Sequence, residues 1–218
     1  MIDLERDGPV WVIRMRNDEN RFNDELVAEL HEALDAVEDA DAHAALVTIG
    51  EGRFYSNGLD LEWMASAGER AGQCLGDVHR LLGRVLGFPA ITVAAVNGHA
   101  FAAGAMFACA HDFVVMRADR GYWCLPEVDL GLPLTAPMYA VVSAKLPMAT
   151  LHEVLVTGRR YGAEEAVTAG IVNEAVAQDQ VKPRAVQIAS ALADKDRDVI
   201  TEHKRLLYEG ALTLCSTA

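Results

Sequence analysis

Glu127 lies in the stretch YWCLPEVDLGLPL (residues 122–134), where leucines and prolines surround two carboxylates. Apolar surroundings disfavour the charged form of a carboxyl group, so its pKa rises and it can accept and donate a proton near neutral pH. Asp129, two residues further on, is a competing candidate, and either side chain could equally belong to an exposed loop. The stretch therefore offers a proton carrier whose identity the local sequence leaves open.

Two further stretches could supply backbone hydrogen-bond donors. Gly58-Leu59-Asp60 lies where a strand and its loop lead into a helix, and Ala102-Ala103-Gly104-Ala105 opens a second helix. The first N–H groups of a helix lack intrahelical partners, and small residues let another atom approach them closely. The purely structural alternatives are a turn capped by Asp60 and a tightly packed helix.

Donors at two such junctions can act on the same atom if the junctions lie side by side. An α/β sheet places its strand-to-helix junctions along one edge. Two N–H groups that converge there on one oxygen form an oxyanion hole, which stabilises negative charge as it develops during a reaction. Together with a nearby carboxyl group, the parts would suit proton transfer next to a carbonyl.

The elements that must position these groups follow from the apolar pattern. Residues 10–15, 44–50, 90–98 and 112–118 read as strands without polar alternation, which is typical of strands buried on both faces. Helical spacing fills the gaps, over residues 23–39 with Asn23 as a cap, over about 61–87 with a break near Gly68 and Gly72, and over about 103–110. We therefore expect an α/β fold with a mainly parallel sheet.

The pattern changes after about residue 134, where helical segments dominate and only residues 170–176 read as a short strand. We expect an α/β core over residues 1–134 and a helical C-terminal region over residues 135–218. No Pro/Ser-rich linker separates them, so we expect the two parts to form one structural unit rather than tethered domains.

Composition excludes several classes of partner. The 218 residues carry a formal net charge of −13, which argues against nucleic-acid binding and against docking on an anionic membrane. No apolar stretch is long enough to span a bilayer. The four cysteines form no CxxC pair and have no histidines at zinc spacing, so we expect no metal site and a reducing compartment. Neither a signal peptide nor a peroxisomal address is evident, and we expect a cytoplasmic location.

The stretches RFYSNGLDLEW (53–63), NGHAFAAGAMFACAHD (97–112), LPEVDLGLP (125–133) and LVTGRRYGAEEAVTAGIVNEAV (155–176) together resemble the crotonase, or enoyl-CoA hydratase/isomerase, superfamily. The resemblance covers nearly the whole chain and is greatest to the short plant-type Δ3,Δ2-enoyl-CoA isomerases. It implies a spiral of ββα units with a helical C-terminal region that serves oligomerisation, as a homotrimer or a dimer of trimers. It also implies an acyl-CoA thioester as ligand, with coenzyme A as part of the substrate and no separate cofactor.

The resemblance assigns roles to individual residues. The backbone N–H groups of Leu59 and Ala103 correspond to the family's oxyanion donors, and Glu127 corresponds to its main catalytic glutamate. Enoyl-CoA hydratases have a second glutamate two residues beyond the last glycine of the glycine-rich turn, where this chain has Met106. Methionine is neither acid nor base, which favours a double-bond isomerase. A hydratase, another crotonase reaction such as thioester hydrolysis or decarboxylation, and an acyl-CoA-binding protein with little turnover are the alternatives.

Substrate contacts are expected from the residues around these donors. Arg53 and Arg21 are candidates for the coenzyme A phosphates, against the alternative of solvated surface. The other expected substrate-binding residues, several of which could equally be plain core, are Asn57, Gly58, Asp60, Leu61, Trp63, Met64, Gly104, Met106, Trp123 and Leu132.

Overall fold

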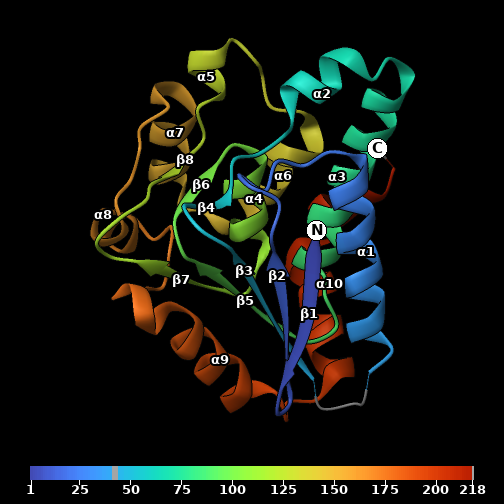
Figure 1. Ribbon diagram of the computed structural model, residues 1–218, viewed down its shortest axis with the longest axis vertical. Coiled ribbons are helices and arrows are strands. Elements are labelled where there is room, and N and C mark those ends of the chain that lie inside the picture. Colours follow the sequence, from blue (N-terminus) through green and yellow to red (C-terminus); the bar gives the residue numbers. More distant parts are fainter. Residues whose placement is uncertain (41–43, 218) are drawn as a thin grey trace.

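The computed structural model describes residues 1–40 and 44–217 (Figure 1). Its larger sheet has the strand order β1-β2-β3-β5-β7-β9, in which only the β1–β2 pair is antiparallel. The strands of this sheet are β1 (Ile2–Asp7), β2 (Val10–Met15), β3 (Ala45–Gly50), β5 (Ile91–Val96), β7 (Phe113–Arg117) and β9 (Glu174–Val176). The mainly parallel α/β sheet expected from the sequence is confirmed.

A second, smaller sheet runs beside the first and gives the fold its repeat. It pairs three short strands in parallel, in the order β4 (Phe54–Ser56), β6 (His99–Phe101) and β8 (Trp123–Cys124). Each follows a strand of the larger sheet and precedes a helix, so the chain repeats a β-β-α unit that winds as a spiral. The sequence pattern alone predicted none of these short strands, because two or three residues are too few to show a period.

Helices cover both faces of the larger sheet (Figure 1). The helices are α1 (Asp24–Glu38), α2 (Leu61–Ser66), α3 (Glu69–Leu86), α4 (Ala103–Ala110), α5 (Glu127–Leu130), α6 (Ala136–Lys145), α7 (Met148–Thr157), α8 (Ala163–Thr168), α9 (Val181–Leu192) and α10 (Arg197–Ser216), with a 3-10 turn η1 (Gln178–Gln180). One face packs against α9 through a separate apolar cluster, and the other packs against the main core under α1, α3 and α4. No helix in residues 1–40 and 44–217 combines the length and hydropathy needed to cross a bilayer.

Local signals in the sequence explain where several helices begin and end. Asn23 caps α1 by accepting the Leu26 N–H at 2.9 Å, as its position predicted. The expected break in the long helical stretch lies at Gly68, whose φ of +60° separates α2 from α3. The predicted strand over residues 170–176 is reduced to β9, whose pairing with β7 makes it the edge of the sheet. The sequence pattern did not identify β1 or α10.

Lys204 connects α10 to the segments that lead into β5 and β7 of the larger sheet. Its Nζ is buried and donates to the carbonyl oxygens of Phe88 and Ala90 at 2.9 and 2.8 Å and to the Asp112 carboxylate at 2.7 Å. Removing one partner of a buried ion pair leaves the other charge without compensation. The packing of α10 against the sheet therefore depends on the ion pair between the buried Lys204 and Asp112.

We expect Lys204→Met to lower the free energy of unfolding by about 3–5 kcal/mol, measured by chemical denaturation. The matched control is Arg205→Met on the same helix, where the exposed ion pair with Glu202 is worth less than about 1 kcal/mol. Equal effects of the two substitutions would contradict the role given to Lys204.

Candidate active site

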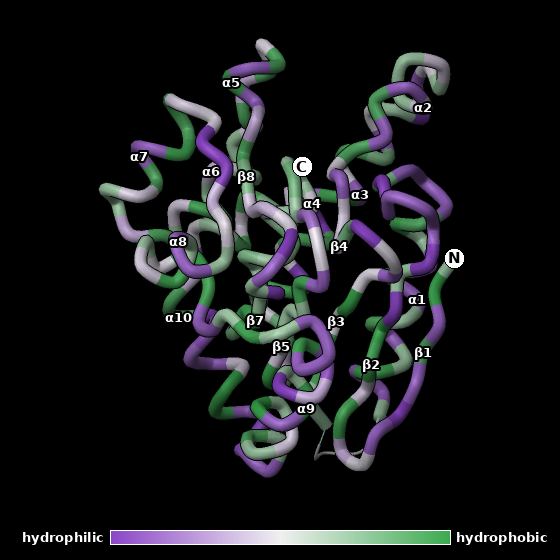
Figure 2. Tube along the Cα trace, turned by 60° about the vertical axis from the view of Figure 1, so that its left-hand side comes forward, coloured by the Kyte–Doolittle hydropathy of each residue, from purple (hydrophilic) through white to green (hydrophobic). Residues whose placement is uncertain are grey.

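Helices α2 and α5 protrude at one end of the molecule (Figures 1 and 2). A cavity of about 780 Å³ is lined by residues of both helices. One wall comes from α2 and α3, and the other from α5, the segment after it and α6. Most of its lining is apolar, and the polar exceptions include Glu127, Asn57 and two arginines, Arg21 and Arg160. The cavity therefore offers an apolar chamber with a few polar groups, which is typical of small-molecule sites.

The first junction predicted from the sequence lies on this cavity and leaves one amide unused. Gly58 has φ +81°, and the Asp60 side chain caps α2 by accepting the Trp63 N–H at 3.0 Å. The N–H groups of Gly58 and Asp60 donate to Ser56 Oγ and to the Phe22 carbonyl oxygen. No hydrogen bond within residues 1–40 and 44–217 engages the N–H of Leu59, which lines the cavity.

The second junction repeats this arrangement. Ala102 has φ +50° and ψ −127°, a conformation that alanine seldom adopts, and its N–H donates to the Cys124 carbonyl oxygen at 3.0 Å. Ala103 then begins α4, and the part of the chain that the structure describes supplies no acceptor for its N–H. Ala103 lines the same cavity as Leu59. Strain of this kind is typical of functional sites.

The two junctions are in direct contact. The strands that lead into them, β4 and β6, pair in parallel with Ser56 opposite Ala100. A Cβ added to Gly58 would lie 2.8 Å from the Ala102 Cβ and 3.2 Å from the Ala103 nitrogen. Only glycine allows this approach, so the two free amides belong to backbone segments held against each other.

Glu127 is the carboxyl group of this cavity. It begins α5 directly after Pro126, it is half-buried, and its Oε2 is buried without a hydrogen-bond partner among the described residues. Desolvation by burial raises its pKa from 4.5 to about 7. Asp129 is exposed and lies against Gly158 instead of lining the cavity. Of the two candidates, Glu127 is therefore the one whose surroundings suit proton transfer.

Of the twelve other residues predicted to contact substrate or coenzyme A, five line the same cavity. Gly58 and Asp60 shape the first junction without lining the cavity, and Trp63 lies half-buried with the Arg70 guanidinium above its ring. Among the residues expected to contact substrate or coenzyme A, those that line the cavity are Asn57, Leu61, Met64, Leu132 and Arg21.

Besides Gly58, Asp60 and Trp63, four predicted contacts do not line the cavity. Met106 and Trp123 are buried in the core, where the indole N–H of Trp123 donates to the Ala105 carbonyl oxygen, so neither reaches the cavity. Gly104 packs against Ser56 and does not line the cavity. Arg53 lies at a separate cavity of about 430 Å³. The apolar character of Met106 and Trp123 suits a pocket and a core equally, and the structure places both side chains in the core.

Sequence reasoning missed several residues that line the cavity, among them Arg160, Phe101, Cys124 and Thr135. Arg160 reaches the site because the next residue, Tyr161, forms an antiparallel bridge with Trp123. The Arg160 guanidinium lies 5.6 Å above the Phe101 ring. A bridge between residues so distant in sequence has no local signal. The double arginine of residues 159–160 could have been noted as local positive charge in an acidic chain.

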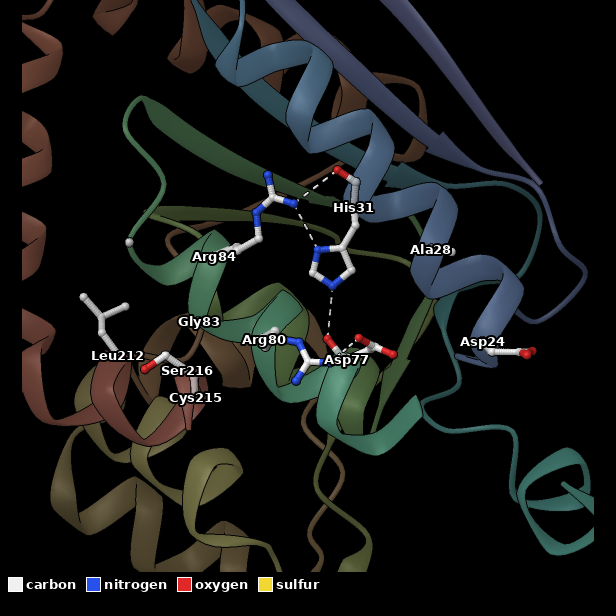
Figure 3. Close-up of a pocket in the computed structure, with 11 residues that line it drawn as sticks. Asp24, Ala28, His31, Asp77, Arg80, Gly83, Arg84, Leu212, Cys215 and Ser216 are labelled. Atoms are coloured by element: carbon white, nitrogen blue, oxygen red, sulfur yellow. Dashed lines mark hydrogen bonds and ion pairs between the residues drawn. The ribbon is translucent and has the colours of Figure 1, made fainter. Parts of the chain in front are cut away.

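A second cavity of about 740 Å³ lies between α1, α3 and α10 (Figure 3). Its polar side chains bind one another: Arg84 donates to Asp35, Glu38 and the His31 ring, and the other nitrogen of that ring meets the Asp77 carbonyl oxygen. Burial lowers the pKa of His31, so its ring is neutral near pH 7. These groups stabilise the packing of the helices. No cluster of three potential metal ligands occurs in the described residues.

Comparison with known proteins places the fold and the motifs in a family. The sequence pattern of the enoyl-CoA hydratase/isomerase family matches residues 5–212. The chain is 37% identical to enoyl-CoA delta isomerase 3 of Arabidopsis thaliana and 34% identical to the peroxisomal enoyl-CoA delta isomerase 2, over 95% of this chain and 92% of each relative. A probable enoyl-CoA hydratase from Mycobacterium tuberculosis superposes with a TM-score of 0.92 at 25% identity, over 99% of this chain and 91% of that one. The β-β-α spiral, the two strand-to-helix junctions and these matches agree, and the chain belongs to the enoyl-CoA hydratase/isomerase family.

Proposed function

We propose that the protein is a Δ3,Δ2-enoyl-CoA isomerase, which converts a 3-enoyl-CoA to the conjugated trans-2-enoyl-CoA. The observation that carries the proposal is that Glu127 is the only carboxyl side chain among the described residues that line the cavity. Adding water to a double bond requires groups that hold and activate the water, whereas moving the bond requires one group that takes and returns a proton. The relatives named enoyl-CoA delta isomerase support the same choice.

In the proposed mechanism the thioester oxygen accepts hydrogen bonds from the N–H groups of Leu59 and Ala103. Ionised Glu127 removes a proton from C2, and the negative charge of the resulting dienolate moves onto that oxygen. The protonated carboxyl then gives the proton to C4, which completes the shift. A carboxyl with a pKa of about 7 suits both steps, because neither form is strongly favoured at neutral pH.

The rest of the cavity fits the other parts of such a substrate. Leu61, Met64 and Leu132 offer apolar surface to the acyl chain. Arg21 and Arg160 place positive charge at the cavity in a chain whose net charge is −13, where the coenzyme A phosphates can bind them. In this mechanism coenzyme A is part of the substrate and no further cofactor acts. The cytoplasmic location and the homotrimer or dimer of trimers stay predictions from the sequence.

One assay tests the proposal. Purified protein should convert a 3-enoyl-CoA to a product with the ultraviolet absorbance of a conjugated thioester, and the same protein should leave a 2-enoyl-CoA almost unhydrated. Faster hydration than isomerisation would make the protein a hydratase. Binding of acyl-CoA without conversion of either substrate would make it a binding protein, and both outcomes contradict the proposal.

A further inference from the structure

Ser56 is a buried polar residue that contacts both segments carrying the amide donors and does not line the cavity. Its hydroxyl accepts the N–H of Gly58, the residue before the Leu59 donor, and its backbone and side chain pack against Gly104, the residue after the Ala103 donor. We propose that Ser56 is a positioning residue, which selects the Leu59 N–H as a donor and fixes its separation from the Ala103 N–H. The inference rests on the proposed function, because it concerns the oxyanion site of that reaction.

The hydrogen bonds of Ser56 assign each of its atoms a role. Its O–H donates to the Asn20 carbonyl oxygen at 2.7 Å, so its lone pairs are left to accept the Gly58 N–H at 3.2 Å. Asn57 and Asp60 donate their N–H groups to the carbonyl oxygens of Glu19 and Phe22. The Gly58 N–H would otherwise be a second free donor beside that of Leu59. Among residues 57–60, the Ser56 hydroxyl therefore leaves Leu59 as the one amide that no described residue engages.

The acceptor of the Ser56 proton is itself fixed. Asn20 is fully buried with φ +51°, and its side-chain amide donates to the carbonyl oxygens of Phe54 and Tyr55 at 3.3 and 3.1 Å. Its side-chain oxygen accepts the Asn17 N–H at 2.8 Å. Because every polar group of Asn20 is engaged, the Ser56 hydroxyl has one orientation that satisfies its neighbours.

Packing connects the same serine to the second donor. A Cβ added to Gly104 would lie 2.5 Å from the Ser56 carbonyl oxygen and 2.6 Å from its Cβ and Oγ. Gly104 follows Ala103 directly in α4, so Ser56 touches the residue next to the second donor. A displacement of Ser56 therefore moves both amides, which gives this side chain control of their separation.

Alanine at this position would keep the packing and remove the hydrogen bonds. The Gly58 N–H and the Asn20 carbonyl oxygen would then be buried without partners, which a small rotation of the backbone can relieve. Such a rotation turns the neighbouring Leu59 N–H away from the thioester oxygen. A misplacement of about 1 Å in an active site can cost about 100-fold in rate.

We expect Ser56→Ala to lower kcat by roughly 10- to 100-fold while KM changes less than about threefold, because the donors act mainly on the charge that develops after binding. The acid limb of the pH profile should stay near pH 7, since the surroundings of Glu127 are unchanged. Infrared difference spectra of a bound saturated acyl-CoA, labelled with ¹³C at the thioester carbonyl, supply a readout without turnover. Wild-type protein should lower the carbonyl frequency, and Ser56→Ala should return it toward that of free thioester.

The matched control is Thr150→Ala on α7, which removes a similarly buried hydroxyl that donates to the Ala169 carbonyl oxygen at 2.7 Å. It should leave both kcat and the carbonyl frequency at wild-type values. If Ser56→Ala does not fold, Ser56→Cys keeps the contact with a weaker donor and should give an intermediate frequency. Wild-type kcat and frequency in either Ser56 variant, or equal losses in the Thr150 control, would overturn the inference.

The spectra also separate this inference from the proposed function. If the wild-type protein binds the saturated acyl-CoA and lowers its carbonyl frequency but isomerises nothing, the proposed reaction is wrong and the Ser56 inference still stands on the frequency. If it isomerises a 3-enoyl-CoA and Ser56→Ala changes neither kcat nor frequency, only the inference is wrong.

Discussion

Glu127→Gln is expected to lower the rate of double-bond isomerisation by about 10⁴-fold, the upper end of what a single acid–base group contributes. The reason is that the same carboxyl group takes the proton from C2 and gives it to C4, and no other carboxyl side chain lines the cavity within the described residues. Initial rates with a 3-enoyl-CoA, followed by ultraviolet absorbance, measure the effect. Binding of a saturated acyl-CoA should stay within a few-fold of wild type.

The pH dependence of the wild-type enzyme provides a second measure of the same group. Because the pKa of Glu127 is about 7, kcat/KM should fall as the pH drops below 7 and the base becomes protonated. The raised pKa also means that the folded state binds this proton more tightly than the unfolded chain. Ionising Glu127 therefore costs stability as the pH rises from about 4.5 to about 7. Glutamine removes that cost, so the variant should unfold at a higher denaturant concentration at pH 8.

Asp129→Asn is the control, since Asp129 is an exposed carboxylate on the same short helix. It should retain wild-type activity and the acid limb near pH 7. An Asp129→Asn variant as inactive as Glu127→Gln, or a Glu127→Gln variant with more than about a tenth of wild-type activity, would contradict the assignment of the proton carrier.

Gly58→Ala is expected to lower kcat by about 100-fold or more and to destabilise the fold by about 1–3 kcal/mol. The added Cβ would lie 2.8 Å from the Ala102 Cβ, 2.9 Å from the Phe101 carbonyl oxygen and 3.2 Å from the Ala103 nitrogen. These are mainly backbone neighbours, which cannot turn aside as a long side chain can. The two junctions must separate, and the pair of donors no longer fits one oxygen atom.

The control must carry the same backbone strain without the contact. Gly8 has φ +59° in the turn between β1 and β2, and a Cβ added there meets nothing within 4 Å. Gly8→Ala should lose a comparable amount of stability in denaturation experiments and keep its kcat. A Gly58→Ala variant that loses stability but not kcat would show that contact between the junctions does not matter for turnover.

The sequence by itself determined much of this protein. Runs of apolar residues without alternation predicted the central strands, because a strand buried on both faces carries apolar side chains on both faces. The cap at Asn23 and the break at Gly68 depend on neighbouring residues and were equally evident. The order of small residues, glycines and one glutamate carried the resemblance that gave Leu59, Ala103 and Glu127, all of which line one cavity.

Only the tertiary structure decided which side chains reach that cavity and what holds its amides. Met106 and Arg53 were expected there, yet one is in the core and the other is at a different cavity, while Arg160 arrives from a segment distant in sequence. Ser56 gave no signal, since a serine before a turn is common and its partners Asn20 and Gly104 lie 36 and 48 residues away. Helix capping and hydrophobic periodicity depend on residues that are close together in the chain. A cavity depends on packing between residues that are far apart in the chain, and a single sequence does not show which of them will be in contact.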